Sequence, residues 1–223
     1  MIAPVACVVP ALDAGRTLPH VARALRDALP HATLIAVDDG SRDDTYAAAA
    51  ATFDRVLRFT HNRGKGAALR AGIAEALALG VSAVVTIDAD GQHDPESAPA
   101  LLAALAGADV AIGARARGGA MPLARRVTNA LAAAAVGTIV GVAVADAQSG
   151  YRAMRRTVLE RVAALGDRYE FETDFLIRAM EAGFRVVAVP VATRYGAPSH
   201  FRAVRDGARV IRTIWRHRAG VRR

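Results

Sequence analysis

An acidic pair follows an apolar run of the sequence, and its spacing suits metal chemistry. Asp88 and Asp90 come directly after the run Ala83–Ile87. Residues two apart in an extended segment face the same side, so these carboxylates can bind one hard cation, Mg²⁺ or Mn²⁺, that bridges phosphates. Gln92 can add an amide oxygen. The competing interpretation is a solvated turn in which Asp94 caps the next helix.

A second acidic pair, Asp38 and Asp39, ends the run Thr33–Val37 and precedes Gly40 and Ser41. Two adjacent carboxylates at this position could hydrogen-bond the base and ribose of a nucleotide. Asp, Gly and Ser are also ordinary turn residues, so turn formation and helix capping explain the segment equally well.

Positive charge and glycine gather in residues 62–66, which read Asn-Arg-Gly-Lys-Gly and open the helical pattern Ala67–Leu79. Helix N-termini favour phosphate, so Lys65 is a candidate phosphate ligand. The segment lacks the G-x-x-x-x-G-K-[ST] spacing of a P-loop, and the chain has no G-x-G-x-x-G dinucleotide signature.

These residues belong to elements that alternate regularly over the first 113 residues. Apolar runs predict strands, and periodic segments between them predict helices. The predicted strands are Ala3–Val9, Thr33–Val37, Arg55–Phe59, Ala83–Ile87 and Val110–Gly113. The alternation predicts an α/β fold with a Rossmann-like, mostly parallel sheet flanked by helices. Ligands of such sheets bind at the carboxyl edge, where both acidic pairs lie.

Beyond residue 113 the alternation gives way to a mixed order of elements. We predict a helix over Pro122–Val142, a polar loop over Asp146–Met154 leading into a short strand, helices over Thr157–Ala164 and Thr173–Ala182, a strand over Arg185–Pro190 and a basic amphipathic helix over Phe201–Arg223.

Charge is divided between the two halves of the chain. Residues 1–111 carry 9 basic and 13 acidic groups, whereas residues 112–223 carry 20 basic and 8 acidic groups, a net charge of −4 against +12. The second half therefore suits an anionic partner: nucleic acid, a membrane surface or a phosphorylated substrate. The single cysteine, Cys7, excludes a disulfide framework, and the N-terminus lacks the charged start of a signal peptide, so we expect a cytoplasmic protein.

Six segments resemble, in order, the motifs of family 2 glycosyltransferases, most closely the branch of dolichol-phosphate mannose synthase and related polyprenol-phosphate glycosyltransferases. They read VVPALDAG, VDDGS, NRGKGAALRAG, TIDADGQHDPE, DAQSGYRAMRR and YEFETDFLIRA. The resemblance covers roughly residues 3–200 and implies a GT-A fold, with a catalytic domain over residues 1–200. The arginine-rich, amphipathic pattern of residues 201–223 predicts a helix at the membrane interface.

The implied reaction is a metal-dependent, inverting transfer of a hexose, mannose or glucose, to a polyprenyl phosphate. The donor would be a nucleotide sugar of the GDP-mannose or UDP-glucose type. Asp88, Asp90 and Gln92 would hold Mg²⁺ or Mn²⁺ on its diphosphate, and Asp38, with Asp39 nearby, would contact the base. The other donor-side positions that the resemblance implies are Pro10, Leu12, Asp13, Lys65 and Ala89.

The resemblance also implies residues for the sugar and the acceptor. Arg115 and Arg117 lie in the stretch whose arginine approaches the acceptor phosphate, and Arg126 and Asn129 match the basic helix that follows. The remaining implied substrate contacts are Ser149 and Arg152 around the sugar and phosphate, Glu172 and Asp174 facing the donor sugar, and Ser199. Among all these residues, the implied catalytic ones are Asp90, Arg117, Arg126 and Asp174.

The first loop departs from the family pattern P-[AV]-[YLF]-N-E. Here Asp13 stands where Asn is common, and Ala14 stands where Glu is common. A carboxylate contact to the nucleotide has therefore moved by one residue or is lost.

Three other functions compete with this one. A family 2 enzyme that glycosylates a hydroxyl of a glycan or small molecule would need a carboxylate base, for which Asp174 is the candidate. A nucleotidyltransferase also couples a metal to an α/β sheet. A nucleic-acid-binding module would use the arginine-rich tail, but the tail lacks interleaved aromatics, so we expect no nucleic-acid partner. We expect instead peripheral contact with the inner face of the cytoplasmic membrane, where basic amphipathic helices bind.

Overall fold

The computed structural model describes residues 4–115, 137, 149–193, 212–213 and 217. Its strands are β1 (Val5–Ala11), β2 (Thr33–Asp38), β3 (Arg55–Arg58), β4 (Ala83–Thr86), β5 (Val110–Arg115), β6 (Arg152–Arg155) and β7 (Val186–Val191). Its helices are α1 (Leu18–Ala28), α2 (Thr45–Thr52), α3 (Lys65–Ala78), η1 (Pro95–Ser97), α4 (Ala98–Ala104), α6 (Arg156–Arg161) and α7 (Phe171–Glu181). Strand and helix alternate as far as β5, as the sequence predicts.

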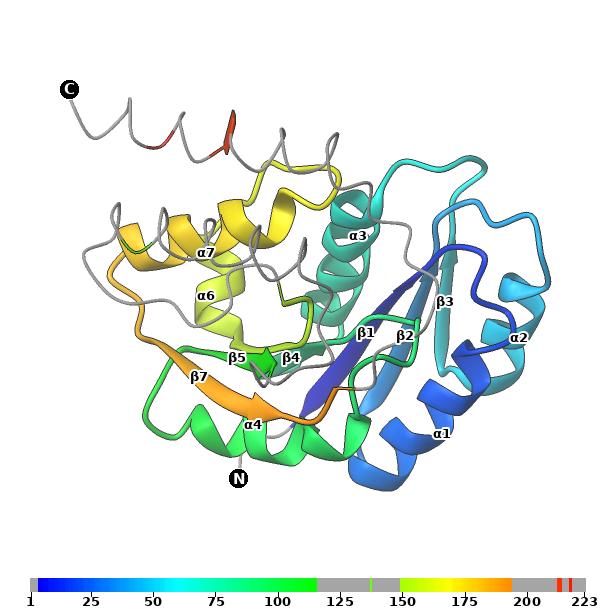
Figure 1. The fold of residues 1–223 in the computed structure, drawn as a ribbon, viewed down its shortest axis with the longest axis horizontal. Helices are drawn as coiled ribbons and strands as arrows, with labels where there is room; N and C mark the ends of the chain where they lie inside the picture. The colour runs from blue at the N-terminus through cyan, green and yellow to red at the C-terminus, as the bar shows by residue number, and fades with distance from the viewer. Residues whose placement is uncertain (1–3, 116–136, 138–148, 194–211, 214–216, 218–223) are drawn as a thin grey trace.

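The strands form one seven-stranded sheet in the order β3-β2-β1-β4-β6-β5-β7 (Figure 1). The β1–β2, β2–β3, β1–β4 and β5–β7 pairs are parallel, and β6 runs antiparallel between β4 and β5. The predicted mostly parallel sheet is therefore confirmed. The chain moves from β1 to β2 and β3 on one side and returns to β4 on the other, so a ligand crevice is expected where β1 and β4 end.

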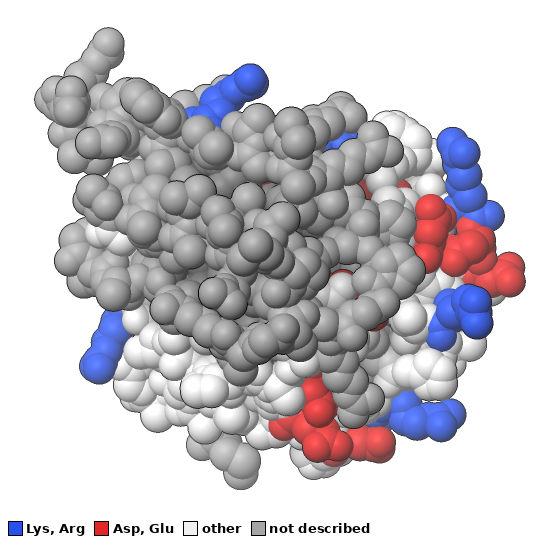
Figure 2. All heavy atoms as spheres, viewed as in Figure 1, with Lys and Arg blue, Asp and Glu red and all other residues white. Residues whose placement is uncertain are grey.

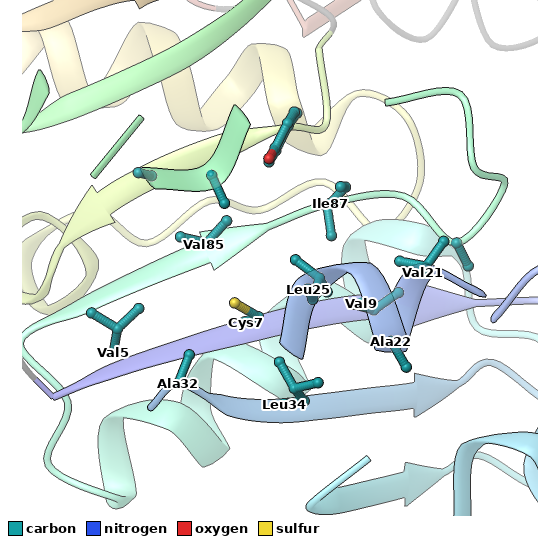
Figure 3. Packing of buried hydrophobic residues seen from close by; sticks show 14 of the residues in the cluster. Val5, Cys7, Val9, Val21, Ala22, Leu25, Ala32, Leu34, Val85 and Ile87 are labelled. Atoms are coloured by element: carbon teal, nitrogen blue, oxygen red, sulfur yellow. The ribbon is translucent and has the colours of Figure 1, made fainter. Parts of the chain in front are cut away.

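Alternate residues of β1 pack on opposite faces of the sheet. Val5, Cys7 and Val9 join α1, α2 and α4 in one core, which Figure 3 shows around Leu25. Ala6 and Val8 join α3, α6 and α7 in the other core. Burial raises the pKa of the Cys7 thiol to about 12, so this cysteine is an inert core residue, as expected from its apolar run.

Strand β1 continues through Pro10, where the sequence pattern predicts that it ends. Pro10 pairs in register with Val37 of β2. On the other side of β1, the strand β4 ends at Thr86, opposite Val8. The missing N–H of Pro10 therefore points past the end of β4 and removes no bond from the sheet.

Two hydroxyls near the starts of α1 and α2 make long-range contacts instead of capping bonds. Helix α2 begins at Thr45, and the Ser41 hydroxyl accepts the Asp13 amide at 2.9 Å. Thr17 precedes α1, but its hydroxyl donates to the Ala89 carbonyl at 2.6 Å and makes no cap bond. Both side chains thus connect the loops at the carboxyl edge of the sheet.

The described surface carries both signs of charge. Figure 2 shows acidic and basic side chains next to one another along the edge where α1 and α2 lie. No helix in the described ranges combines the length and apolar character needed to cross a bilayer. The predicted helix Pro122–Val142 lies almost entirely outside the described residues, and so does the tail Phe201–Arg223 apart from residues 212–213 and 217.

Candidate active site

The loop that follows β4 carries the D-x-D acidic pair and is fixed at both ends. At its start, the Thr86 hydroxyl donates to the Gly150 carbonyl at 2.8 Å. At its end, the Tyr151 hydroxyl donates to the Pro95 carbonyl at 3.2 Å. Both contacts are buried and come from the segment that leads into β6. The acidic loop is therefore positioned by residues more than fifty positions along the chain.

Lys65 joins the acidic loop to α7. Its Nζ lies 2.6 Å from Asp88 Oδ1 and 2.7 Å from Glu172 Oε1. Burial alone would lower the pKa of Lys65, but the charges of Asp88 and Glu172 outweigh burial and raise it above its ordinary value. Lys65 is therefore a fixed positive charge between two carboxylates at the carboxyl edge of the sheet.

Gly150 leaves the space that this cluster occupies. A Cβ at Gly150 would lie 2.7 Å from Lys65 Nζ and 2.8 Å from each carboxylate oxygen of Asp88. A Cβ at Gly66 would instead meet the backbone of Gly166 and Asp167. Gly150 therefore makes room for the ends of two side chains, whereas Gly66 makes room for the backbone of residues 166–167.

This contrast predicts different stabilities for two alanine variants. Gly66→Ala is expected to lower the free energy of unfolding by about 1–2 kcal/mol, because the backbone of residues 166–167 cannot move aside without strain. Gly150→Ala is expected to cost less than about 0.5 kcal/mol, because the tips of Lys65 and Asp88 can rotate away. Urea titration of both variants measures the difference. Equal losses would contradict this description of the cluster.

Glu172 presents a buried carboxylate that the described residues satisfy only in part. Its side chain is 3% exposed, and Lys65 is its ion-pair partner. Its Oε2 accepts no hydrogen bond from the described part of the chain. Because a buried carboxylate oxygen is costly without a donor, this atom suits a ligand that brings a hydroxyl or amide.

Ser149 and Arg152, expected around the sugar and phosphate, are buried in the scaffold beside Glu172. The guanidinium of Arg152 donates from Nε to the Ser149 carbonyl and from Nη1 to the Glu172 carbonyl, both at 2.8 Å. Ser149 Oγ lies 3.4 Å from the Tyr151 amide, which donates to it. Arg152 thus fixes the first turn of α7, which carries Glu172.

Asp174 does not join Glu172, although the motif places both in one acidic pair. Its Oδ2 accepts from the Leu165 amide and from Arg178 Nε, and its Oδ1 lies 2.8 Å from His217 Nε2. Burial alone would raise the pKa of Asp174, but these hydrogen-bond donors outweigh burial and lower the pKa below its ordinary value. A carboxylate engaged at both oxygens is poorly suited to act as a general base.

The acidic pair at the end of β2 is buried and engaged by its own loops. Asp38 Oδ1 accepts the Ser41 amide at 2.9 Å, and its Oδ2 lies 3.2 Å from Arg58 Nε. The two oxygens of Asp39 accept the amides of Arg63 and Gly64 at 2.7 and 2.9 Å. Burial raises the pKa of Asp39 despite these bonds. These contacts are those of the turn interpretation, and contact of Asp38 with a nucleotide base stays a prediction.

Asp13, at which the first loop departs from the family pattern, is held in place by the loop after β2. Asp13 has φ +48°, a left-handed conformation in which Asp and Asn are several-fold enriched among non-glycine residues. Its Oδ1 accepts the Arg42 amide, and the next amide, of Ala14, donates to Thr45 Oγ1 at 2.7 Å. The loops after β1 and β2 are thus interlocked, and Asp13 itself is exposed.

The start of α3 is not open to phosphate as the sequence predicts. The Asp167 carbonyl accepts the Ala67 amide at 3.0 Å, and Arg70 binds the Gly166 carbonyl and the Asp167 carboxylate. The loop of residues 162–170 therefore covers this helix end. The positive charge that faces the acidic loop comes from the Lys65 side chain instead.

The other predicted substrate positions divide into two groups. Pro10 and Ala89 are buried, and Leu12 is half-buried, all at the carboxyl edge of the sheet. The backbone of Arg115 pairs with Val191 at the end of β5. The predicted residues outside the described ranges are Arg117, Arg126, Asn129 and Ser199.

The acidic loop fits a divalent cation that is shared with a substrate. Within residues 4–115 and 149–193 and the few others described, no group of three His, Cys, Asp or Glu side chains could hold a metal alone. Asp88 and Asp90 offer hard oxygen ligands, and the backbone N–H of the buried Gln92 donates to Asp90 Oδ1 at 3.0 Å. Mg²⁺ is typically held by one or two carboxylates plus substrate phosphates, so this donor set suits a metal–diphosphate complex.

Comparison with known proteins places these features in context. The family model described as glycosyl transferase family 2 matches residues 6–163. The chain is 39% identical over 198 residues to polyprenol monophosphomannose synthase of Mycolicibacterium smegmatis, covering 82% of this chain and 75% of that protein. It is 34% identical over 196 residues to undecaprenyl-phosphate mannosyltransferase of Micrococcus luteus, covering 82% and 81%.

A solved structure shares the fold. Glucosyl-3-phosphoglycerate synthase from Mycobacterium tuberculosis, crystallised with Mn²⁺, uridine diphosphate and glucosyl-3-phosphoglycerate, matches with a TM-score of 0.76 and 26% identity. The match covers 96% of this chain and 79% of that one.

Proposed function

Because the chain belongs to glycosyl transferase family 2, we propose that it transfers a hexose from a nucleotide diphosphate sugar to a polyprenyl phosphate, with inversion at the anomeric carbon. Mannose is the first sugar to test, since two relatives are named as mannose-transferring enzymes, with glucose as the other candidate. GDP-mannose and UDP-glucose are the corresponding donors. The catalytic unit would span residues 1–200, and residues 201–223 would contact the inner face of the cytoplasmic membrane.

The observation that carries this proposal is the Asp88–Lys65–Glu172 cluster at the carboxyl edge of the sheet. Asp88, Asp90 and Gln92 would hold Mg²⁺ or Mn²⁺, which supplies Lewis-acid neutralisation of charge on the departing diphosphate. Lys65 would add a second positive charge beside that diphosphate. Glu172 would accept a sugar hydroxyl at its Oε2.

The state of Asp174 favours a phosphate acceptor over a hydroxyl acceptor. A hydroxyl would need a carboxylate base, and both oxygens of Asp174 are engaged by other groups. A phosphate is already ionised at neutral pH and needs no strong base. We propose that Arg117 and Arg126 orient it by forked hydrogen bonds.

A donor and acceptor screen tests this function. Purified protein with Mn²⁺ or Mg²⁺ would be incubated with GDP-mannose or UDP-glucose, alone or with a short polyprenyl phosphate or 3-phosphoglycerate. We expect nucleoside diphosphate to be released only with the lipid phosphate. Release that depends on 3-phosphoglycerate would favour the hydroxyl-acceptor alternative, and no release with any acceptor would refute the assignment.

The membrane proposal makes a separate prediction. Residues 201–223 contain eight arginines, and each basic residue near an anionic bilayer contributes roughly 1 kcal/mol. Replacing Arg202 and Arg205 by glutamine is expected to weaken binding to phosphatidylglycerol vesicles about thirtyfold, as measured by co-sedimentation. Arg23→Gln, on α1, is the matched control and should bind as the parent does. Unchanged binding by the double variant would exclude the tail as the contact.

A further inference from the structure

The Lys65 ammonium lies on the carboxylate oxygen that a metal would use. Its Nζ is 2.6 Å from Asp88 Oδ1. A carboxylate binds Mg²⁺ at about 2.0–2.1 Å, so a metal on this oxygen would bring two positive centres within a few ångströms of each other. Their repulsion is substantial where solvent is partly excluded. Metal binding and the present Lys65–Asp88 contact therefore compete.

The two carboxylates that hold Lys65 differ in their access to solvent. The side chain of Asp88 is 26% exposed, whereas that of Glu172 is 3% exposed. An ion arriving from solution can therefore reach Asp88, while Glu172 remains with Lys65. The Lys65 and Asp88 tips lie where a Cβ at position 150 would collide with them, so the missing side chain of Gly150 leaves room for their contact.

We propose that Lys65 is a built-in counter-ion of the donor site, which neutralises Asp88 until metal and diphosphate arrive together and then remains on Glu172. This inference rests on the proposed function. Its consequence is that metal alone binds weakly, because Lys65 opposes it. A nucleoside diphosphate supplies the negative charge that offsets Lys65, so metal and nucleotide raise each other's affinity.

Metal titration without any sugar or acceptor tests this coupling. Mn²⁺ binding would be followed by the electron paramagnetic resonance of free Mn²⁺, with and without GDP or UDP. Lys65→Met is expected to bind Mn²⁺ alone about tenfold more tightly than the parent, and to gain less affinity when nucleotide is added. Arg70→Gln, which removes one positive charge from the same helix, should match the parent within about twofold.

The outcomes separate the two proposals. Equal or weaker Mn²⁺ binding by Lys65→Met, or an equal gain in Arg70→Gln, would overturn the counter-ion role. A parent protein that binds no Mn²⁺ even with GDP or UDP would instead refute the metal assignment of the proposed function.

A second readout needs no variant, because Lys65 is the only lysine of the chain. Labelling with ¹⁵N-lysine gives one side-chain ammonium resonance. We expect Mg²⁺ with GDP or UDP to shift that resonance, as Lys65 exchanges Asp88 for the diphosphate. A resonance that does not move at saturating Mg²⁺ and nucleotide would overturn the proposal.

Discussion

Asp90→Ala is expected to lower kcat/KM for sugar transfer about a thousandfold while the protein stays folded. The variant removes one of the two carboxylates that hold the metal, and metal stabilisation of transition-state charge is worth several kcal/mol. Each 1.36 kcal/mol corresponds to a tenfold change in rate, so three decades is the expected scale. Initial rates with a polyprenyl phosphate, measured over a range of Mn²⁺ concentrations, give the effect.

Asp94 provides the matched control for this variant in the same loop. Its Oδ1 accepts the Glu96 amide at 3.1 Å as a helix cap. Asp94→Asn is expected to keep transfer within severalfold and to cost at most about 1 kcal/mol of stability, since Asn also caps helices. If Asp90→Ala kept full transfer activity, the metal assignment would be wrong.

The parallel sheet is the part of the fold that the sequence predicts best. Five apolar runs alternate with helical patterns, and parallel strands place their carboxyl ends at one edge. This rule correctly brings Asp88 to the same edge as Lys65, which opens α3. The antiparallel β6 between β4 and β5 could not be placed, because nothing local in Arg152–Arg155 specifies its neighbours.

The contacts that complete the site are long-range and have weak local signals. The sequence pattern predicts Lys65 at a helix start that favours phosphate, whereas the loop of residues 162–170 covers that start and leaves the Lys65 side chain as the phosphate candidate. This contact joins Ala67 to Asp167, 100 residues along the chain, so the local sequence around Lys65 does not predict it. The position of Gly150 beside Lys65 and Asp88 cannot be predicted either, because a single glycine contributes no hydrophobic periodicity to the sequence.

A two-residue shift in one helix boundary changes the interpretation of the acidic pair in α7. The sequence predicts a helix from Thr173, which would leave Glu172 in an extended segment. The helix begins instead at Phe171, so Glu172 and Asp174 are both helical. Residues two apart in a helix point in nearly opposite directions, which sends Glu172 to Lys65 and Asp174 to Arg178.

The motif implies that Arg152 contacts substrate, whereas the structure shows its guanidinium bound to backbone carbonyls. The variant Arg152→Lys separates these two roles. We expect this variant to lose about 2 kcal/mol of unfolding free energy. The guanidinium is buried and donates to two carbonyls twenty-three residues apart, those of Ser149 and Glu172. A lysine ammonium lacks the planar fork and cannot serve both carbonyls. The Glu172 carbonyl keeps the helical amide four residues on. The Ser149 carbonyl loses its Arg152 donor, and a buried carbonyl without a donor costs about 1–3 kcal/mol.

Urea unfolding measures this loss as a lower midpoint with an unchanged slope. The matched control is Arg155→Lys on the same strand, where the guanidinium also donates to backbone carbonyls but is only half-buried. We expect a loss near 1 kcal/mol there, because water can reach the groups left unpaired. If Arg152→Lys unfolded like the parent and lost only substrate affinity, Arg152 would be a substrate ligand. The bonds to Ser149 and Glu172 would then contribute little to holding α7 against the donor site.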